Sequence, residues 1–118
     1  MFNIFKKRTK AQILIQSDIK NIMDNKKLAL IMFGAGWCGA CKMQKPIINE
    51  MAHYHKDSSV IIAMVDTDQE PLVSSMFQIS VLPTILAIQH NKVIFKKTGL
   101  MSRKVLETLF SELEKSSI

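Results

Sequence analysis

The stretch Trp37-Cys38-Gly39-Ala40-Cys41-Lys42 contains the only two cysteines among the 118 residues of the chain. A continuous apolar run, residues 28–33, precedes it, and a segment with apolar residues at helical spacing follows it. Two sulfurs separated by two residues form a disulfide only where the chain turns sharply, and a junction between a strand and a helix supplies that turn. The sequence therefore predicts a buried strand, a tight turn at the cysteines and a helix that begins beside them.

The two cysteines are expected to differ in their chemistry. A thiol in the first turn of a helix faces unpaired backbone N–H groups and the positive end of the helix dipole, which favour thiolate over thiol. Cys38 is therefore the expected nucleophile. Cys41 follows one turn later on the same helix face, where its sulfur can attack a mixed disulfide formed at Cys38.

The rest of the chain alternates between short apolar runs and amphipathic segments. Expected strands cover residues 11–16, 28–33, 60–65, the segment after the Leu82-Pro83-Thr84 break, and 92–98. Expected helices cover 17–25 with Ser17 as its cap, 38–56, 71–77 and a last one that opens at Ser102. The element order is βαβαβαββα, which predicts an α/β fold with a central mixed sheet of about five strands flanked by about four helices.

Methionine is frequent in the chain, with eight residues. We expect core packing rather than copper binding for most of them. In the helix that follows the cysteines, the expected buried positions recur at helical spacing and Pro46 bends the axis. The methionines assigned to core spacing are Met23, Met43, Met51, Met76 and Met101. The expected buried face of the helix after the cysteines comprises Met43, Ile47, Met51 and Tyr54.

Length and composition limit the broad class of the protein. With 118 residues, 47% of them hydrophobic, the chain is long enough for one domain with its own core. We assign residues 11–118 to this domain and residues 1–10 to a basic N-terminal extension. The N-terminus lacks an apolar signal core, and no run approaches the roughly 18 apolar residues of a membrane span, so we expect a cytoplasmic protein without a membrane association.

The formal net charge of +6 raises the question of nucleic-acid binding. The lysines and arginines are scattered along the chain, and the one small cluster at residues 6–10 lacks the interleaved aromatic residues of a nucleic-acid site. We expect no nucleic-acid partner, although the basic charge can steer acidic protein partners. Two cysteines at this spacing also differ from the several bridges of small secreted domains, which favours a reactive pair over a structural one.

With this motif between a buried strand and a helix, the sequence resembles the thioredoxin family over residues 11–115. The family pattern of Trp-Cys-Gly-x-Cys-Lys with a proline in the following helix is present as Trp37 to Lys42 with Pro46. The Ile/Leu-Pro-Thr loop of the family matches Leu82-Pro83-Thr84, and its late glycine matches Gly99. The resemblance implies a thioredoxin fold.

The resemblance also implies roles for residues around the cysteines. Pro83 is expected to follow a cis peptide bond, with Leu82 offering its backbone N–H and C=O to an extended substrate in strand fashion. An apolar groove around the reactive sulfur is expected to consist of Trp37, Gly99 and Leu100. Gly39 and Ala40, between the cysteines, complete the expected substrate-contacting set.

Several positions depart from the family pattern. Met32 occupies the position of the usual buried aspartate, Met64 that of its lysine partner, and Gly34 that of a second tryptophan. Because the aspartate is thought to help deprotonate the second cysteine, we expect slower resolution of the mixed disulfide at neutral pH. Ala40 replaces the usual proline and loosens the turn, which should shift the redox potential modestly.

These observations predict a thiol-disulfide oxidoreductase that reduces protein disulfides through Cys38 and Cys41. The expected partners are protein disulfide substrates and a thioredoxin-reductase-like electron donor, and the expected protein is a monomer without cofactor or metal. An oxidase or isomerase of an oxidising compartment, a non-catalytic thioredoxin-like binding module and shared metal or cluster coordination by two chains remain alternatives.

Three polar residues have competing interpretations. Asp66 either faces the space beneath the cysteines as a substitute base or serves a turn at the end of its strand, and we favour the turn. His53 and His55 lie on different faces of a helix with no third ligand nearby, so a zinc site is not expected.

Overall fold

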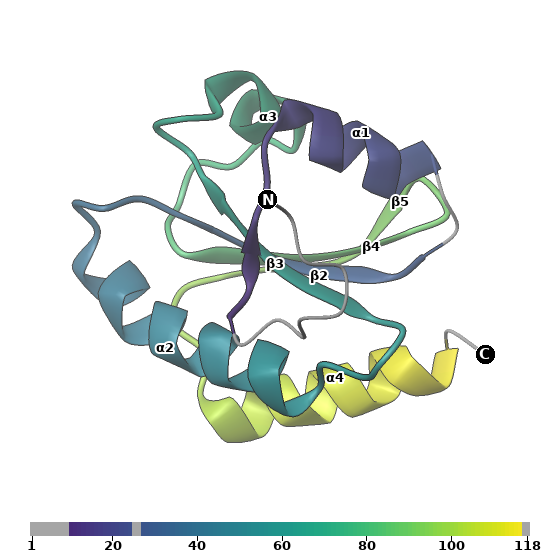
Figure 1. Cartoon of the computed structure of the whole chain (residues 1–118). Helices are drawn as coiled ribbons and strands as arrows, with labels where there is room; N and C mark the ends of the chain where they lie inside the picture. Colours follow the sequence, from purple (N-terminus) through teal and green to yellow (C-terminus); the bar gives the residue numbers. More distant parts are fainter. Residues whose placement is uncertain (1–9, 25–26, 117–118) are drawn as a thin grey trace, which may run out of the picture.

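One mixed sheet of five strands forms the centre of the computed structural model, which describes residues 10–24 and 27–116 (Figure 1). The strand order is β1-β3-β2-β4-β5, in which β1, β3 and β2 run parallel and β4 and β5 are antiparallel to their neighbours. The strands are β1 (Gln12–Ile13), β2 (Ala29–Gly34), β3 (Ile61–Asp66), β4 (Thr84–Gln89) and β5 (Lys92–Thr98). This arrangement confirms the expected element order and fold.

Four helices cover the two faces of this sheet. Figure 1 shows α1 and α3 on one face and α2 and α4 on the other. The helices are α1 (Gln16–Asp24), α2 (Gly39–Tyr54), α3 (Pro71–Met76) and α4 (Arg103–Ser116). None of the helices within the described residues is both long and apolar enough to cross a bilayer.

Strand β2 is the central element that delivers the chain to the cysteines. All six of its residues are buried, as expected for a central strand covered by helices on both faces. Successive side chains of a strand point to opposite faces, so Leu30 and Met32 join the core beneath α2 and α4, whereas Ile31 and Phe33 join the core beneath α1 and α3. The first core includes both cysteines, which places the motif at its edge.

The first strand and helix differ from their expected bounds. The strand expected over residues 11–16 is only Gln12–Ile13, because the chain turns into α1 at Ile15. The Ile15 carbonyl accepts the N–H groups of Asp18 and Ile19, and the Asp18 carboxylate accepts the Ile15 N–H at 3.0 Å. Ser17 therefore lies inside the helix, and its expected capping role was wrong.

Helix α2 continues through Pro46, and its buried face overlaps only in part with the expected one, since Met51 is fully buried and Ile47 packs against the core. Its buried residues are Cys41, Gln44, Ile48 and Met51, a stripe whose position is set by Cys41 at the edge of the sheet. Met43 and Tyr54 are 63% and 71% exposed, so their expected burial was wrong. The core position expected for Met76 was also wrong, since that residue is 56% exposed on the short α3.

Candidate active site

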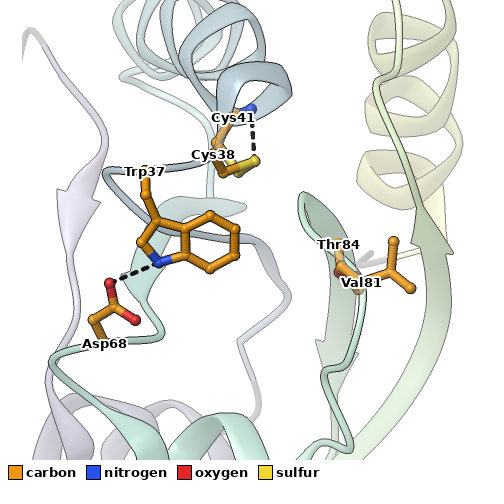
Figure 2. The surroundings of a disulfide bond; sticks show 6 residues. All are labelled: Trp37, Cys38, Cys41, Asp68, Val81 and Thr84. Atoms are coloured by element: carbon orange, nitrogen blue, oxygen red, sulfur yellow. Dashed lines mark hydrogen bonds between the residues drawn. A yellow bond between two sulfur atoms is a disulfide. The ribbon is translucent and has the colours of Figure 1, made fainter.

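The two cysteines form a disulfide at the junction between β2 and α2 (Figure 2). Their Cα atoms are 5.2 Å apart, and Cys38 occupies the N-cap position of α2 with extended backbone angles. Its Sγ accepts the backbone N–H of Cys41 at 3.1 Å. This donor is one of the N–H groups that a helix start leaves without an intrahelical partner, so the arrangement offers a hydrogen bond to negative charge on Cys38 sulfur.

Trp37 carries an exposed indole directly beside this disulfide. The side chain is 71% exposed, whereas Cys38 and Cys41 keep only 7% and 4% of their surface. The indole N–H donates to Asp68 Oδ2 at 3.0 Å, and Figure 2 shows the ring between the disulfide and Asp68. This hydrogen bond fixes one edge of a large apolar surface, which leaves the rest of the ring available for contact.

Asp68 is itself held by the turn that ends β3. Asp66 Oδ1 accepts the backbone N–H groups of Asp68 and Gln69 at 2.9 and 3.4 Å. The turn role of Asp66 is therefore confirmed, although this residue also borders a pocket beside Cys41. The Asp66-Asp68 turn is a part of the site that the analysis of the sequence did not connect with Trp37, because the two segments are far apart in the chain.

The loop before β4 forms a second wall near the cysteines. The Leu82–Pro83 peptide bond is cis, and the hydroxyl of Thr84 donates to the Val81 carbonyl (Figure 2). The half-buried Leu82 packs against the core cluster that contains both cysteines. A segment about forty residues further along the chain therefore packs on the same core as the cysteines.

The glycine loop after β5 is joined to this proline loop. The Gly99 N–H donates to the Pro83 carbonyl at 2.8 Å, and Gly99 has φ +91°, a conformation that residues with a side chain rarely adopt. Leu100, next to it, is 45% exposed. The structure thus brings Leu82, Pro83, Gly99 and Leu100 together on neighbouring loops, while Gly39 and Ala40 remain beside the sulfurs by chain continuity.

A buried glutamine that the sequence analysis missed anchors the glycine loop to α2. Gln44 is fully buried, its Nε2 donates to the Met101 carbonyl at 3.1 Å, and its Oε1 accepts the Met101 N–H at 2.8 Å. Both polar groups of the side chain are therefore satisfied by one backbone segment. A signal for it existed in the sequence: Gln44 follows Cys41 by three positions, on the helix face that starts at the disulfide.

Two methionines line the pocket beside the second cysteine. Met32 and Met64 are in direct register on β2 and β3, and both are buried. A Cβ atom built on Gly34 would lie 3.1 Å from Met32 Cε and 3.2 Å from Cys41 Sγ, so the methionine tip and the sulfur adjoin the same point. The surroundings of Cys41 at these two positions are apolar, in agreement with the sequence.

His53 near the end of α2 and His55 directly after this helix are not among the residues that line the pocket beside Cys41. His55 Nε2 lies 2.6 Å from Glu107 Oε1, and its ring stacks on Phe110. Within residues 10–24 and 27–116 there is no group of three or more histidine, cysteine or acidic side chains placed to hold a metal ion.

Comparison with known proteins agrees with this geometry. The thioredoxin family model matches residues 10–112. Thioredoxin 2 of Chlorobaculum tepidum is 32% identical over 91 residues, which cover 77% of this chain and 83% of the relative. The thioredoxin of Mycoplasmoides gallisepticum is 31% identical over 94 residues, which cover 80% of this chain and 92% of the relative.

Solved structures show the same fold at lower identity. The thioredoxin of Malassezia sympodialis superimposes with a TM-score of 0.82 at 21% identity, covering 97% of this chain and 99% of that one. Because the family model spans nearly the whole chain and the cysteine pair stands at the start of α2, the protein is a member of the thioredoxin family and a thiol-disulfide oxidoreductase of the protein-disulfide reductase class.

Proposed function

We propose that Cys38 is the nucleophile and Cys41 the resolving residue in the reduction of protein disulfides. The observation that carries this assignment is the hydrogen bond from the Cys41 N–H to Cys38 Sγ at the start of α2. Only one of the two sulfurs has this donor, and the donor favours negative charge on that sulfur.

The reaction proceeds in two exchange steps. The Cys38 thiolate attacks one sulfur of the substrate disulfide, the substrate S–S bond breaks, and its other sulfur leaves as a thiolate. Cys41, after losing its proton, attacks Cys38 Sγ in the mixed disulfide, which releases the second substrate sulfur. The substrate gains two electrons and the Cys38-Cys41 pair loses two, which leaves the disulfide seen in the structure.

The substrate is proposed to lie along the loops around Trp37. An extended peptide would pair with the backbone of Leu82 and contact Gly39, Ala40, Gly99 and Leu100, with Pro83 shaping the loop. The exposure of two side chains supports this placement of the substrate, because Trp37 and Leu100 are large apolar residues that are 71% and 45% exposed. Apolar side chains of the substrate would cover these surfaces and gain free energy from their burial.

An external dithiol must restore the reduced pair after each turnover. The thioredoxin family implies a reductase-type partner, and we propose a thioredoxin-reductase-like donor acting on a cytoplasmic monomer. The protein's own chemistry needs only the two thiols and no bound cofactor. The alternative role is that of an oxidase or isomerase. The redox potential of the cysteine pair distinguishes this role from that of a reductase, and equilibration with glutathione measures this potential.

Reduction of an insulin-type protein disulfide tests these roles. Wild-type protein supplied with excess dithiol should accelerate the reduction, and Cys38→Ser should abolish the acceleration. Cys41→Ser should instead accumulate a covalent complex with the substrate, visible on a non-reducing gel. If Cys41→Ser forms no complex while Cys38→Ser does, the two roles are reversed.

The same assay separates catalysis from a binding-only role. A non-catalytic module would hold its partner through Trp37 and Leu82 without accelerating reduction, and Cys38→Ser would leave its biological role intact. Replacing the chemical dithiol by a thioredoxin reductase and its reductant then tests the donor. A wild-type protein that works with the chemical dithiol but not with that reductase requires a different electron donor.

A further inference from the structure

A pocket of about 600 Å³ lies on the Cys41 side of the disulfide. It is bounded by the end of β1, the end of β2, the first turn of α2, and the end of β3 with its following turn. Its lining includes Cys41 together with Met32, Gly34 and Met64. Gly34 lines the pocket at a point where an added Cβ would lie 3.1 Å from Met32 Cε and 3.2 Å from Cys41 Sγ.

Among the residues that the structure describes, the methionines of the inner part of this pocket offer Cys41 no group that could take its proton. Met32 and Met64 are apolar, and apolar surroundings favour a neutral thiol over a thiolate. The resolving step nevertheless requires the thiolate, since this is the nucleophilic form. Some base must therefore reach Cys41 from elsewhere.

The charged side chains that line the pocket are Lys42, Lys45, Asp66 and Glu70. Both carboxylates already serve the backbone: Asp66 Oδ1 accepts two N–H groups of its own turn, and Glu70 Oε1 accepts the Gln16 N–H at 2.7 Å. Both lysines are exposed. Among the described residues at the rim, each carboxylate thus has one oxygen engaged by backbone N–H groups and the lysines are positively charged, which favours a base from solution.

We propose that Cys41 loses its proton through this pocket to a small neutral base from solution, for which imidazole serves as the probe. This inference rests on the proposed role of Cys41 as the resolving residue. The base takes the Cys41 proton, the thiolate forms an S–S bond with Cys38, and the substrate sulfur leaves with the electron pair of the broken bond. The departing thiolate takes a proton from solution, so protons and electrons balance.

A two-step reaction with a symmetric aromatic disulfide whose thiolate is coloured measures this step separately. Reduced protein should release the first equivalent of thiolate when Cys38 attacks and the second when Cys41 resolves the mixed disulfide. The second release is followed by stopped flow at fixed pH and ionic strength while the imidazole concentration is varied. We expect the rate of the second release to rise linearly with the imidazole concentration. Doubling this concentration should double the part of the rate that depends on imidazole.

Each outcome of this experiment bears on one proposal. A second release that is independent of imidazole overturns the inference. A missing first release instead contradicts the role of Cys38, so failure of the proposed function is distinguishable from failure of the inference. Asp66→Asn keeps an oxygen that can accept the Asp68 and Gln69 N–H groups, so a second release that is lost in this variant while the first is unchanged would identify Asp66 as the base and overturn the inference.

Variants at the floor of the pocket test the source of the base. Met32→Asp places a carboxylate beside Cys41 and should raise the second rate while removing its dependence on imidazole. Met32→Leu conserves volume without adding a base and should retain the dependence. Equal imidazole slopes in the Asp and Leu variants would contradict the inference.

Variants that fill the pocket test the route. Gly34→Leu should lower the imidazole slope of the second release and leave the first unchanged. The Cβ that this substitution adds at position 34 would crowd Met32 and Cys41, so a second variant is needed that leaves these residues undisturbed. Ile15→Trp obstructs the pocket from its rim, where Ile15 is 55% exposed. An unchanged slope in both folded variants would show that the base arrives by another route.

Discussion

Gln44 illustrates how one side chain can position a part of the site without contacting substrate. Its two hydrogen bonds hold the Met101 backbone, and the neighbouring Gly99 and Leu100 form one wall of the proposed substrate groove. Because the glutamine is fully buried, an apolar replacement leaves the Met101 N–H and C=O without their partners.

Replacement of Gln44 by leucine is expected to affect both stability and substrate binding. Leaving buried backbone groups unpaired costs about 1–3 kcal/mol, which urea unfolding of the oxidised protein measures. The loosened Gly99 loop should raise KM for a protein disulfide more than it lowers kcat, because the cysteines remain in place. Met43→Leu, on the neighbouring exposed position, is the control and should change stability by less than about 0.5 kcal/mol. Equal effects of the two variants would refute the anchoring role.

At the level of elements, a polar cluster joins the end of α2 to the start of α4. Glu107 lies 2.6 Å from His55 Nε2 and accepts from Arg103 Nε at 3.1 Å, while Arg103 Nη1 reaches Glu50 at 2.8 Å. The His55 ring also stacks on Phe110 with centroids 3.9 Å apart. Burial by itself would raise the pKa of Glu107, but the hydrogen bonds and charges of His55 and Arg103 lower it below its ordinary value.

The lowered pKa of Glu107 predicts a loss of stability in acid. Its contribution is complete above the ordinary pKa of 4.5 and disappears as the pH falls through the lowered value of the folded state. Because the side chain is partly exposed, the contribution should be about 1 kcal/mol or less. Unfolding measured from about pH 6 to about pH 3 should therefore show a shallower acid decline in Glu107→Gln. Glu50→Gln, at the more exposed partner of Arg103, should retain the wild-type decline.

For the whole molecule, basic side chains are found on several of the elements that the structure describes. Lys42 and Lys45 lie on α2 near the disulfide, and Lys92 and Lys97 are exposed on the edge strand β5. The 16 lysines and arginines of the chain outnumber its 10 acidic residues, which gives a formal net charge of +6. Such a distribution raises the encounter rate with acidic partners without specifying one binding site.

The net charge predicts a salt dependence that differs between substrates. The kcat/KM for an acidic protein disulfide should fall as ionic strength rises from about 0.01 M to about 1 M, because the Debye length shrinks from about 30 Å to about 3 Å. The kcat/KM for an uncharged peptide disulfide should change little over the same range. A parallel decline for both substrates would mean that salt acts on the chemistry and not on the encounter.

The sequence by itself determined the local features of this protein. The apolar run of β2, the cysteine spacing and the following helical pattern are properties of residues close in the chain, so they predicted the strand, the turn and α2 directly. Residue identity likewise predicted apolar methionines under Cys41. The face that α2 buries was misjudged, because a helical stripe has to be counted from the contact that orients the helix, here Cys41.

Only the tertiary structure decided which distant residues meet at the site. Gln44 and Met101 are 57 positions apart, and Trp37 and Asp68 are 31 apart, so their pairing depends on the strand order β1-β3-β2-β4-β5. The pocket beside Cys41 likewise requires β1, β2, β3 and α2 to be placed around Gly34. Periodicity in the sequence indicates which face of a segment is buried. Which other segments pack against that face is decided only by the three-dimensional arrangement of the chain.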